Sequence, residues 1–120
     1  MKAAEQGYAD AQFNLGAMYG HGTGVPINYK EAIKWYLKAA EQGEAYAQNN
    51  LGHMYSEGKG IPKNNIKAYV WYSLAAAQYE VFKISLERVA KEMTPEQIAE
   101  AQKEAAVLWE RIQEQKQEKP

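Results

Sequence analysis

The sequence repeats itself after 36 residues, and this repeat constrains the fold more than any other feature. Of residues 1–44, 25 are identical to the residue 36 positions later. The hexapeptide Lys-Ala-Ala-Glu-Gln-Gly at residues 2–7 recurs at residues 38–43, and a Trp-Tyr pair recurs at the same offset. Self-similarity with a period of 20–50 residues is typical of arrays in which each repeat stacks on its neighbours. We therefore expect a solenoid with repeats at residues 8–43 and 44–79.

Each repeat is predicted to contain two helices joined by a glycine loop. The first helix is expected at residues 8–20, and again at 44–57, because apolar residues are spaced as one helical face. A Gly-x-Gly-Val-Pro segment then ends it. The second helix should begin near an asparagine cap and bury a stripe of small and aromatic residues. These residues are Asn28, Ala32, Trp35, Tyr36 and Ala39 in the first repeat and Asn65, Ala68, Trp71, Tyr72 and Ala75 in the second.

Gly16 and Gly52 occupy equivalent positions inside the two first helices. Glycine in a helix interior costs about 1 kcal/mol relative to alanine, so these residues need a compensating role. We expect that the missing Cβ lets a Trp or Tyr ring of the second helix lie against bare backbone.

The repeated pattern resembles a known family. Each repeat contains Ala-x-x-x-Leu-Gly-x-Met-Tyr-x-x-Gly-x-Gly-(Val/Ile)-Pro, and Ala-x-x-Trp-Tyr-x-x-Ala-Ala follows. Over residues 1–78 this resembles the Sel1-like repeat, a relative of the tetratricopeptide repeat. The resemblance implies an all-α, right-handed superhelix of stacked antiparallel helix pairs, and it favours a bacterial source. The tetratricopeptide repeat itself is the structural alternative, although its period is 34 residues and it lacks the paired-glycine loop.

The two ends of the chain depart from the repeat. Residues 1–7 are expected to be the end of a truncated upstream repeat, and residues 80–93 a divergent helix. Thr94 and Pro95 form a helix start signal, so a C-terminal capping helix with one polar face is predicted at residues 94–115. Residues 116–120 are expected to be a frayed tail. The uncapped N-terminal end is a possible surface for end-to-end self-association.

Composition and motifs argue against nucleic-acid binding, metal or cofactor sites and catalysis. Fourteen basic and fifteen acidic residues give a net charge of −1, which offers no basic excess to a nucleic acid. The chain has no cysteine, and its two histidines, His21 and His53, stand in no metal-binding motif. The glycine pairs lack the strand that a phosphate loop requires. We expect no catalytic residue, no cofactor and no metal site.

The sequence says little about location. Apolar runs are short, so no membrane insertion is expected. No apolar segment typical of a signal peptide follows Met1. A soluble protein is therefore expected, cytoplasmic as the sequence stands, or periplasmic or secreted if Met1 is a start added to a fragment; the compartment stays open.

Differences between the two repeats predict a binding surface. Framework positions should match, whereas ligand-facing positions are free to differ. The differing pairs 10/46, 13/49, 17/53 and 21/57 step by three or four residues and so lie along one face of each first helix. With the repeated asparagines, they predict a partner-binding groove on the concave face: Asp10, Phe13, Asn14, Ala17, Tyr46, Asn49, Asn50, His53 and Glu57. The alternative interpretation is a surface that merely tolerates variation.

The resemblance therefore implies a non-catalytic scaffold or adaptor that binds a peptide or partner protein. Two alternatives remain at this point. The chain is a structural cap or self-association segment of a longer repeat protein, or it is a hydrolase of the kind suggested for some cysteine-rich bacterial relatives. The second alternative lacks support from the residues, since neither cysteines nor a nucleophile constellation are present.

Overall fold

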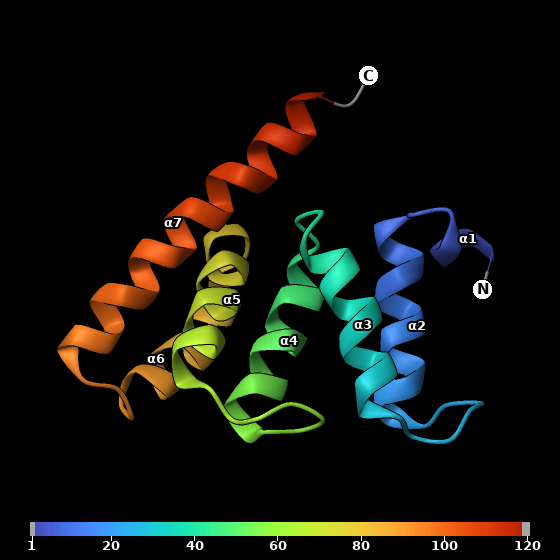
Figure 1. Cartoon of the computed structure of the whole chain (residues 1–120), viewed down its shortest axis with the longest axis horizontal. Coiled ribbons are helices and arrows are strands. Elements are labelled where there is room, and N and C mark those ends of the chain that lie inside the picture. The colour runs from blue at the N-terminus through green and yellow to red at the C-terminus, as the bar shows by residue number, and fades with distance from the viewer. Residues whose placement is uncertain (1, 119–120) are drawn as a thin grey trace.

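The computed structural model describes residues 2–118 and builds them from helices, turns and loops (Figure 1). The elements are α1 (Lys2–Glu5), α2 (Ala9–His21), α3 (Tyr29–Ala40), α4 (Ala45–Glu57), α5 (Asn65–Gln78), the 3-10 helix η1 (Glu80–Phe82), α6 (Lys83–Ala90) and α7 (Pro95–Glu118). The predicted all-α class is confirmed, and each repeat is an antiparallel helix pair, α2–α3 and α4–α5.

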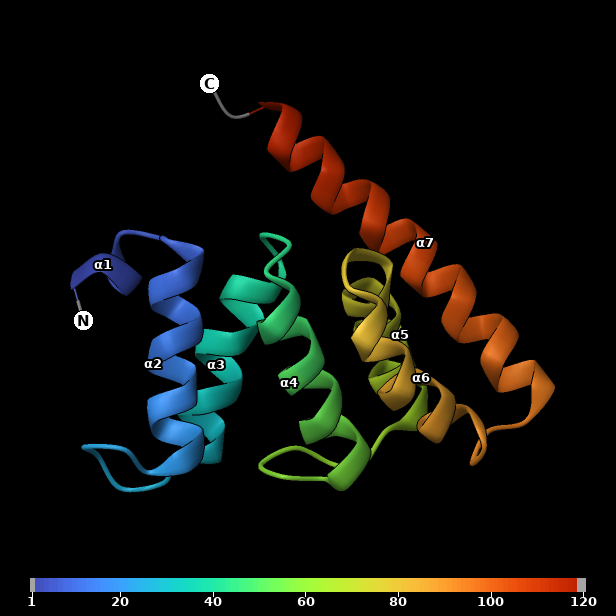
Figure 2. The same cartoon turned by 180° about the vertical axis from the view of Figure 1, so that it is seen from behind.

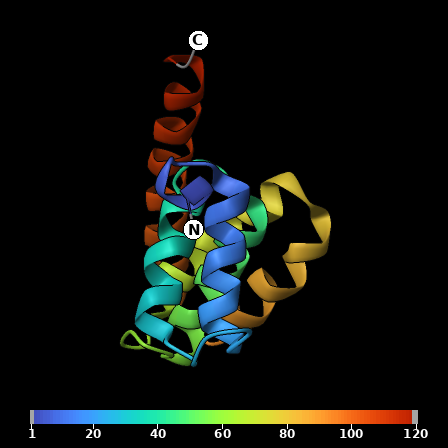
Figure 3. The ribbon, with the colours of Figure 1, turned by 90° about the vertical axis from the view of Figure 1, so that its right-hand side faces the viewer.

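The helices form two layers. Seen from the end that carries the N-terminus, α2, α4 and α6 lie on one side and α3, α5 and α7 on the other (Figure 3). The views from the front and from behind agree that α2 to α5 stand side by side (Figure 2). Helix α7 runs obliquely across the end of this row and packs mainly on α5.

Asparagine caps and glycine turns set the helix boundaries. Asn28 Oδ1 accepts a hydrogen bond from the backbone N–H of Glu31 at 3.1 Å, and Asn64 Oδ1 accepts one from Lys67 at 3.0 Å. The predicted cap at Asn65 is therefore wrong by one residue, because the structural equivalent of Asn28 is Asn64. Gly22 and Gly58 end α2 and α4 in the left-handed conformation, with φ of 72° and 69°.

The expected contact of a helical glycine with an aromatic ring is present in both repeats, and the ring is tyrosine. A Cβ added to Gly16 would lie 2.7 Å from Cδ1 of Tyr36. The same atom on Gly52 would lie 2.7 Å from Cδ1 of Tyr72. Only glycine permits the two helices of a repeat to approach so closely.

The core follows the predicted stripes, and buried glutamines tie neighbouring repeats together. Ala32, Trp35, Tyr36 and Ala39 are all buried, as are their copies in α5. The Gln48 side chain is also fully buried: its Nε2 donates to the Ala40 carbonyl at 3.1 Å and its Oε1 accepts from Gln78 at 3.1 Å. Gln12 makes the same pair of contacts one repeat earlier, with Ala4 and Gln42. Each glutamine adds a second hydrogen bond to a carbonyl at the end of the preceding helix, which also accepts a glycine N–H of the following turn.

In the C-terminal third, the helices differ in detail from those expected there. The divergent segment is split into η1 and the short helix α6, which ends at Ala90. Thr94 and Gln97 form a complete capping box, with reciprocal hydrogen bonds of 2.9 and 3.1 Å. Helix α7 continues to Glu118, so the tail expected at residues 116–120 is helical as far as residue 118. Residues 119–120 lie outside the described residues.

Helices outside the two repeats cover part of both sides of the array. At the C-terminal side, α7 packs on α5 and buries Ile112, and its Lys116 reaches the α3–α4 turn, within about 3 Å of where a Gly43 Cβ would stand. At the other, Ala4 of α1 packs in a cluster with Leu15 and Trp35. These contacts bury apolar side chains that a bare end would expose.

Candidate functional site: the face of the first helices

The outward surface of α2, α4, η1 and α6 is called the first-helix face below. Four aromatic side chains form a row across it. Phe13 of α2 lies 6.1 Å from Tyr46 of α4, which lies 5.7 Å from Tyr79 and 5.6 Å from Phe82, measured between ring centroids. Tyr46 and Tyr79 are 53% and 50% exposed, so their rings are accessible. This aromatic row offers apolar contact to a ligand at several consecutive points.

Two hollows lie farther along the same face, one on each side of His53. The first has a volume of about 320 Å³ and is lined by Gly20, His21, Tyr29, Tyr36, Asn50, His53, Met54, Glu57 and Lys59. The second has a volume of about 200 Å³ and is lined by His53, Ser56, Glu57, Tyr72, Ser85, Arg88, Val89 and Glu92. Both hollows join neighbouring repeats, because their linings come from successive helices of the array.

A hydrogen-bond network fixes the imidazole between the two hollows. His53 Nδ1 lies 2.9 Å from the Tyr72 hydroxyl, which in turn lies 3.2 Å from the Ser56 hydroxyl. The two rings meet edge to face at 5.4 Å. Because Nδ1 is engaged inside the protein, the other ring nitrogen of His53, Nε2, is the one left for a ligand.

Burial shifts the titration of these groups. Burial lowers the pKa of His53; the Glu57 carboxylate opposes this shift, whereas Arg88 and Lys59 add to it. Burial raises the pKa of the Tyr72 hydroxyl. At neutral pH the imidazole is therefore uncharged and the tyrosine protonated, so both present polar groups without a formal charge.

The first repeat contains the equivalent tyrosine in the first hollow. Burial raises the pKa of the Tyr36 hydroxyl, and a hydrogen bond with Asn50 partly offsets the rise. The position of His53 is Ala17 in the first repeat, so this tyrosine has no imidazole partner from its own repeat.

The structure brings five of the nine predicted binding residues into these features. Phe13 and Tyr46 belong to the aromatic row, while Asn50, His53 and Glu57 line the hollows. Asp10 lines a shallower hollow beside Tyr46 and Tyr79.

The other three predicted residues contribute less. Ala17 packs against the core between repeats, and Asn14 is exposed but lines neither hollow beside His53. Asn49 is half-buried, and within the described part of the chain its Oδ1 has no hydrogen-bond partner.

The sequence analysis missed the residues that η1 and α6 contribute to the first-helix face. Phe82 stands 36 residues after Tyr46, and Ser85 stands 36 residues after Asn49. Extending the same offset beyond residue 79 would therefore have placed both on the first-helix face. It also missed the tyrosine hydroxyls, because Tyr36 and Tyr72 match between the repeats and were interpreted as framework alone.

The arrangement suits binding. Among the described residues, no three His, Asp or Glu side chains lie together in a way that could hold a metal ion. Likewise, no helix between residues 2 and 118 combines the length and apolar character needed to cross a membrane. The first-helix face instead offers aromatic rings for apolar contact and fixed polar groups for hydrogen bonds. Together these can hold a ligand in which apolar and polar groups alternate.

Stacked helix pairs with an open, ligand-sized face define an α-helical repeat protein. A comparison with protein families identifies the family within this class. The Sel1 repeat model matches twice, at residues 9–44 and 45–79, and these matches cover more than half of the chain. The protein belongs to the Sel1 repeat family, whose members are generally non-catalytic scaffolds that bind other proteins.

Two solved structures are similar to this chain. One is c5321, a protective antigen present in uropathogenic Escherichia coli strains that displays an SLR fold; it matches with a TM-score of 0.87 and 29% identity over 99% of this chain and 27% of that one. A Sel1 repeat protein from Oxalobacter formigenes matches with a TM-score of 0.62 and 54% identity over 63% of this chain and 31% of that one. This chain thus spans less than a third of either relative. A search of curated proteins found no match.

Proposed function

We propose that this chain is a non-catalytic interaction module that binds an extended peptide segment of a partner protein along the first-helix face. The observation that carries the proposal is the continuity of that face. The aromatic row runs from α2 to η1, and two hollows lined in part by polar side chains flank His53 beside it.

The chemistry of an extended peptide fits these features. Its apolar side chains would pack against exposed rings such as Tyr46 and Tyr79, which contribute large contact areas at a low entropic cost. Its backbone amides would exchange hydrogen bonds with groups already fixed in the fold, namely His53 Nε2 and Asn50. Because the Tyr72 hydroxyl holds His53 in place, little ordering is needed on the protein side.

Selection from a displayed library of random 12-residue peptides tests this proposal. The purified chain should enrich peptides with at least two apolar residues, and these should bind the Tyr46→Glu, His53→Glu double variant about tenfold or more weakly. Ile27→Glu is the matched control, because Ile27 is 56% exposed in the α2–α3 loop and lines neither hollow beside His53. Enriched peptides that bind the double variant as well as the parent, or a selection that enriches nothing, would rule out the first-helix face.

A further inference from the structure

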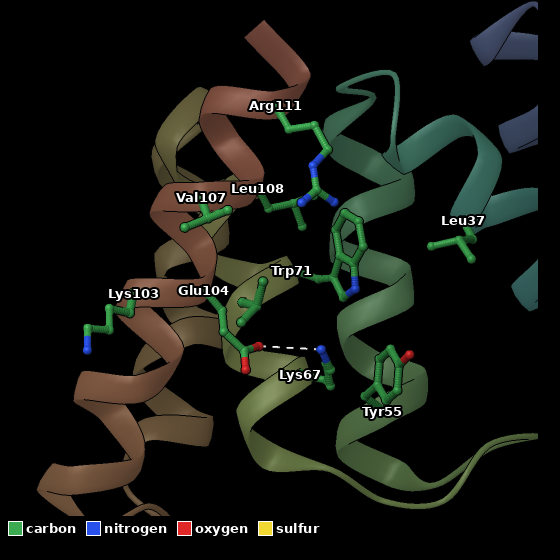
Figure 4. A pocket seen from close by; sticks show the side chains of 10 residues that line it. Leu37, Tyr55, Lys67, Trp71, Lys103, Glu104, Val107, Leu108 and Arg111 are labelled. Atoms are coloured by element: carbon green, nitrogen blue, oxygen red, sulfur yellow. Dashed lines mark hydrogen bonds and ion pairs between the residues drawn. The ribbon is translucent and has the colours of Figure 1, made fainter. Parts of the chain in front are cut away.

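A second cavity lies in the opposite layer, away from the first-helix face. It is bordered by α3, α5 and α7 and by the last turns of α4, with a volume of about 550 Å³ (Figure 4). This volume lies within the range of about 300–1,000 Å³ that is typical of ligand pockets.

The walls of this cavity are largely apolar. Leu37 of α3, Val70 and Trp71 of α5, and Leu108 of α7 contribute aliphatic and indole surface. Val107 stands at the rim and is 57% exposed. A large apolar side chain placed here would contact all three second-layer helices and lose most of its exposure to water.

The charged groups at the cavity are not equivalent. Lys67 and Glu104 pair with each other across the gap between α5 and α7, at 3.4 Å. Figure 4 shows Lys103 pointing away from the cavity and the Arg111 guanidinium pointing from α7 toward Trp71. Within residues 2–117, no carboxylate lies within ion-pair distance of Arg111. The cavity thus combines apolar walls with one cation that has no counter-charge there.

The first repeat shows how this cavity arises. There Trp35, the equivalent of Trp71, has Lys34 and Lys38 over its ring at 5.0 and 4.8 Å. In the second repeat these two lysines are replaced by Val70 and Leu74, which are buried beneath α7. The flank of Trp71 therefore opens into the cavity, and α7 supplies a cation from a different direction.

We propose that this cavity is a second binding site, for a protein segment that carries a carboxylate next to a large apolar side chain. The planar guanidinium of Arg111 can donate two parallel hydrogen bonds to a carboxylate, which a lysine cannot reproduce. The adjacent apolar side chain fills the space against Trp71, Leu37 and Leu108. Charge complementarity selects this occupant over a neutral or basic apolar segment, because either would leave Arg111 without a counter-charge.

Labelled short peptides capped at both ends test the proposal by fluorescence anisotropy. The set places Asp or Glu beside Phe or Leu, in both orders, between Ser-Gly flanks. Each peptide has two matched controls, with Asn or Gln for the acid and with Ser for the apolar residue. We expect saturable binding of at least one acidic–apolar peptide, about tenfold or more weakening in both of its controls, and a shift of the Trp71 indole N–H resonance.

Protein variants decide whether Arg111 carries the selectivity. Arg111→Gln should weaken the acidic peptide about tenfold and leave its amide control unchanged. Lys103→Gln makes the same change in net charge and should have little effect, because that side chain points away. The Tyr46→Glu variant should bind the acidic peptide as tightly as the parent protein does, which separates this site from the first-helix face. Equal binding of acid and amide, equal effects of the Arg111 and Lys103 variants, or no saturable binding by any peptide would overturn the proposal.

Discussion

Replacing Gly52 with alanine tests the close contact on which both repeats depend. A Cβ at this position would lie 2.7 Å from Cδ1 and 2.8 Å from Cε1 of Tyr72, so the ring must move. The ring is not free to do so, because its hydroxyl is hydrogen-bonded to His53 and lies 3.2 Å from the Ser56 hydroxyl. The added methyl group therefore strains both the core and the polar network at its edge.

Two opposing terms set the expected magnitude. Overpacking a well-packed core costs about 1–3 kcal/mol. Alanine regains about 1 kcal/mol over glycine in helix propensity. We expect Gly52→Ala to lower the free energy of unfolding by about 1 kcal/mol, which corresponds to a fall in Tm of about 4 °C for a chain of this size.

Gly20 provides a matched control for this prediction. It also lies in a first helix, but a Cβ there would be no nearer than 3.5 Å to the Tyr36 hydroxyl, an ordinary contact. Gly20→Ala should therefore raise the free energy of unfolding by about 0.5–1 kcal/mol. Urea unfolding followed by far-UV circular dichroism measures both variants. If the two alanines shift stability in the same direction by similar amounts, the packing explanation for Gly52 is refuted.

Three further predictions can be checked by the same unfolding assay. Gln48→Leu should cost about 1–3 kcal/mol, because it removes two hydrogen bonds of a fully buried side chain, one to the Ala40 carbonyl and one from Gln78. Burial holds the pKa of His53 below that of the unfolded chain, so stability should fall as the pH drops below about 6.5, less steeply in His53→Gln. Thr94→Ala should cost about 0.5–2 kcal/mol by breaking the capping box, and Thr94→Ser should restore it.

The repeats could be predicted from the sequence because their determinants are local. Helix periodicity, asparagine caps and glycine turns each act within a few residues, so two copies of the pattern give two nearly identical helix pairs. Even the contact between Gly52 and an aromatic ring could be inferred. A glycine inside a helix lowers stability, so its missing Cβ should allow a close contact that compensates. The identity of the ring as Tyr72, however, depends on how the two helices pack.

The candidate site was predicted only in part, for a physical reason. Comparing the repeats separates positions that match from positions that differ, and a matching residue was interpreted as framework. Tyr72 matches Tyr36, yet it belongs both to the framework and to the candidate site, because its ring packs under Gly52 while its hydroxyl holds His53 at the surface. One side chain with an apolar body and a polar tip serves both packing and binding. A comparison of residue identities cannot separate these two roles.

A further difference between the repeats explains why α7 docks on α5. On the outer face of α3, Lys30, Lys34 and Lys38 follow each other at helical spacing; the equivalent stripe on α5 is Ile66, Val70 and Leu74. A helix packed over the α3 stripe would have to remove three ammonium groups from water, which costs far more than the apolar contact returns. Over α5 the same contact buries hydrocarbon alone, and α7 docks there. The docking position of α7 is therefore encoded in the exchange of three lysines for aliphatic residues. The same exchange removes from the flank of Trp71 the lysines that lie over Trp35, so the docking of α7 and the second cavity have one cause.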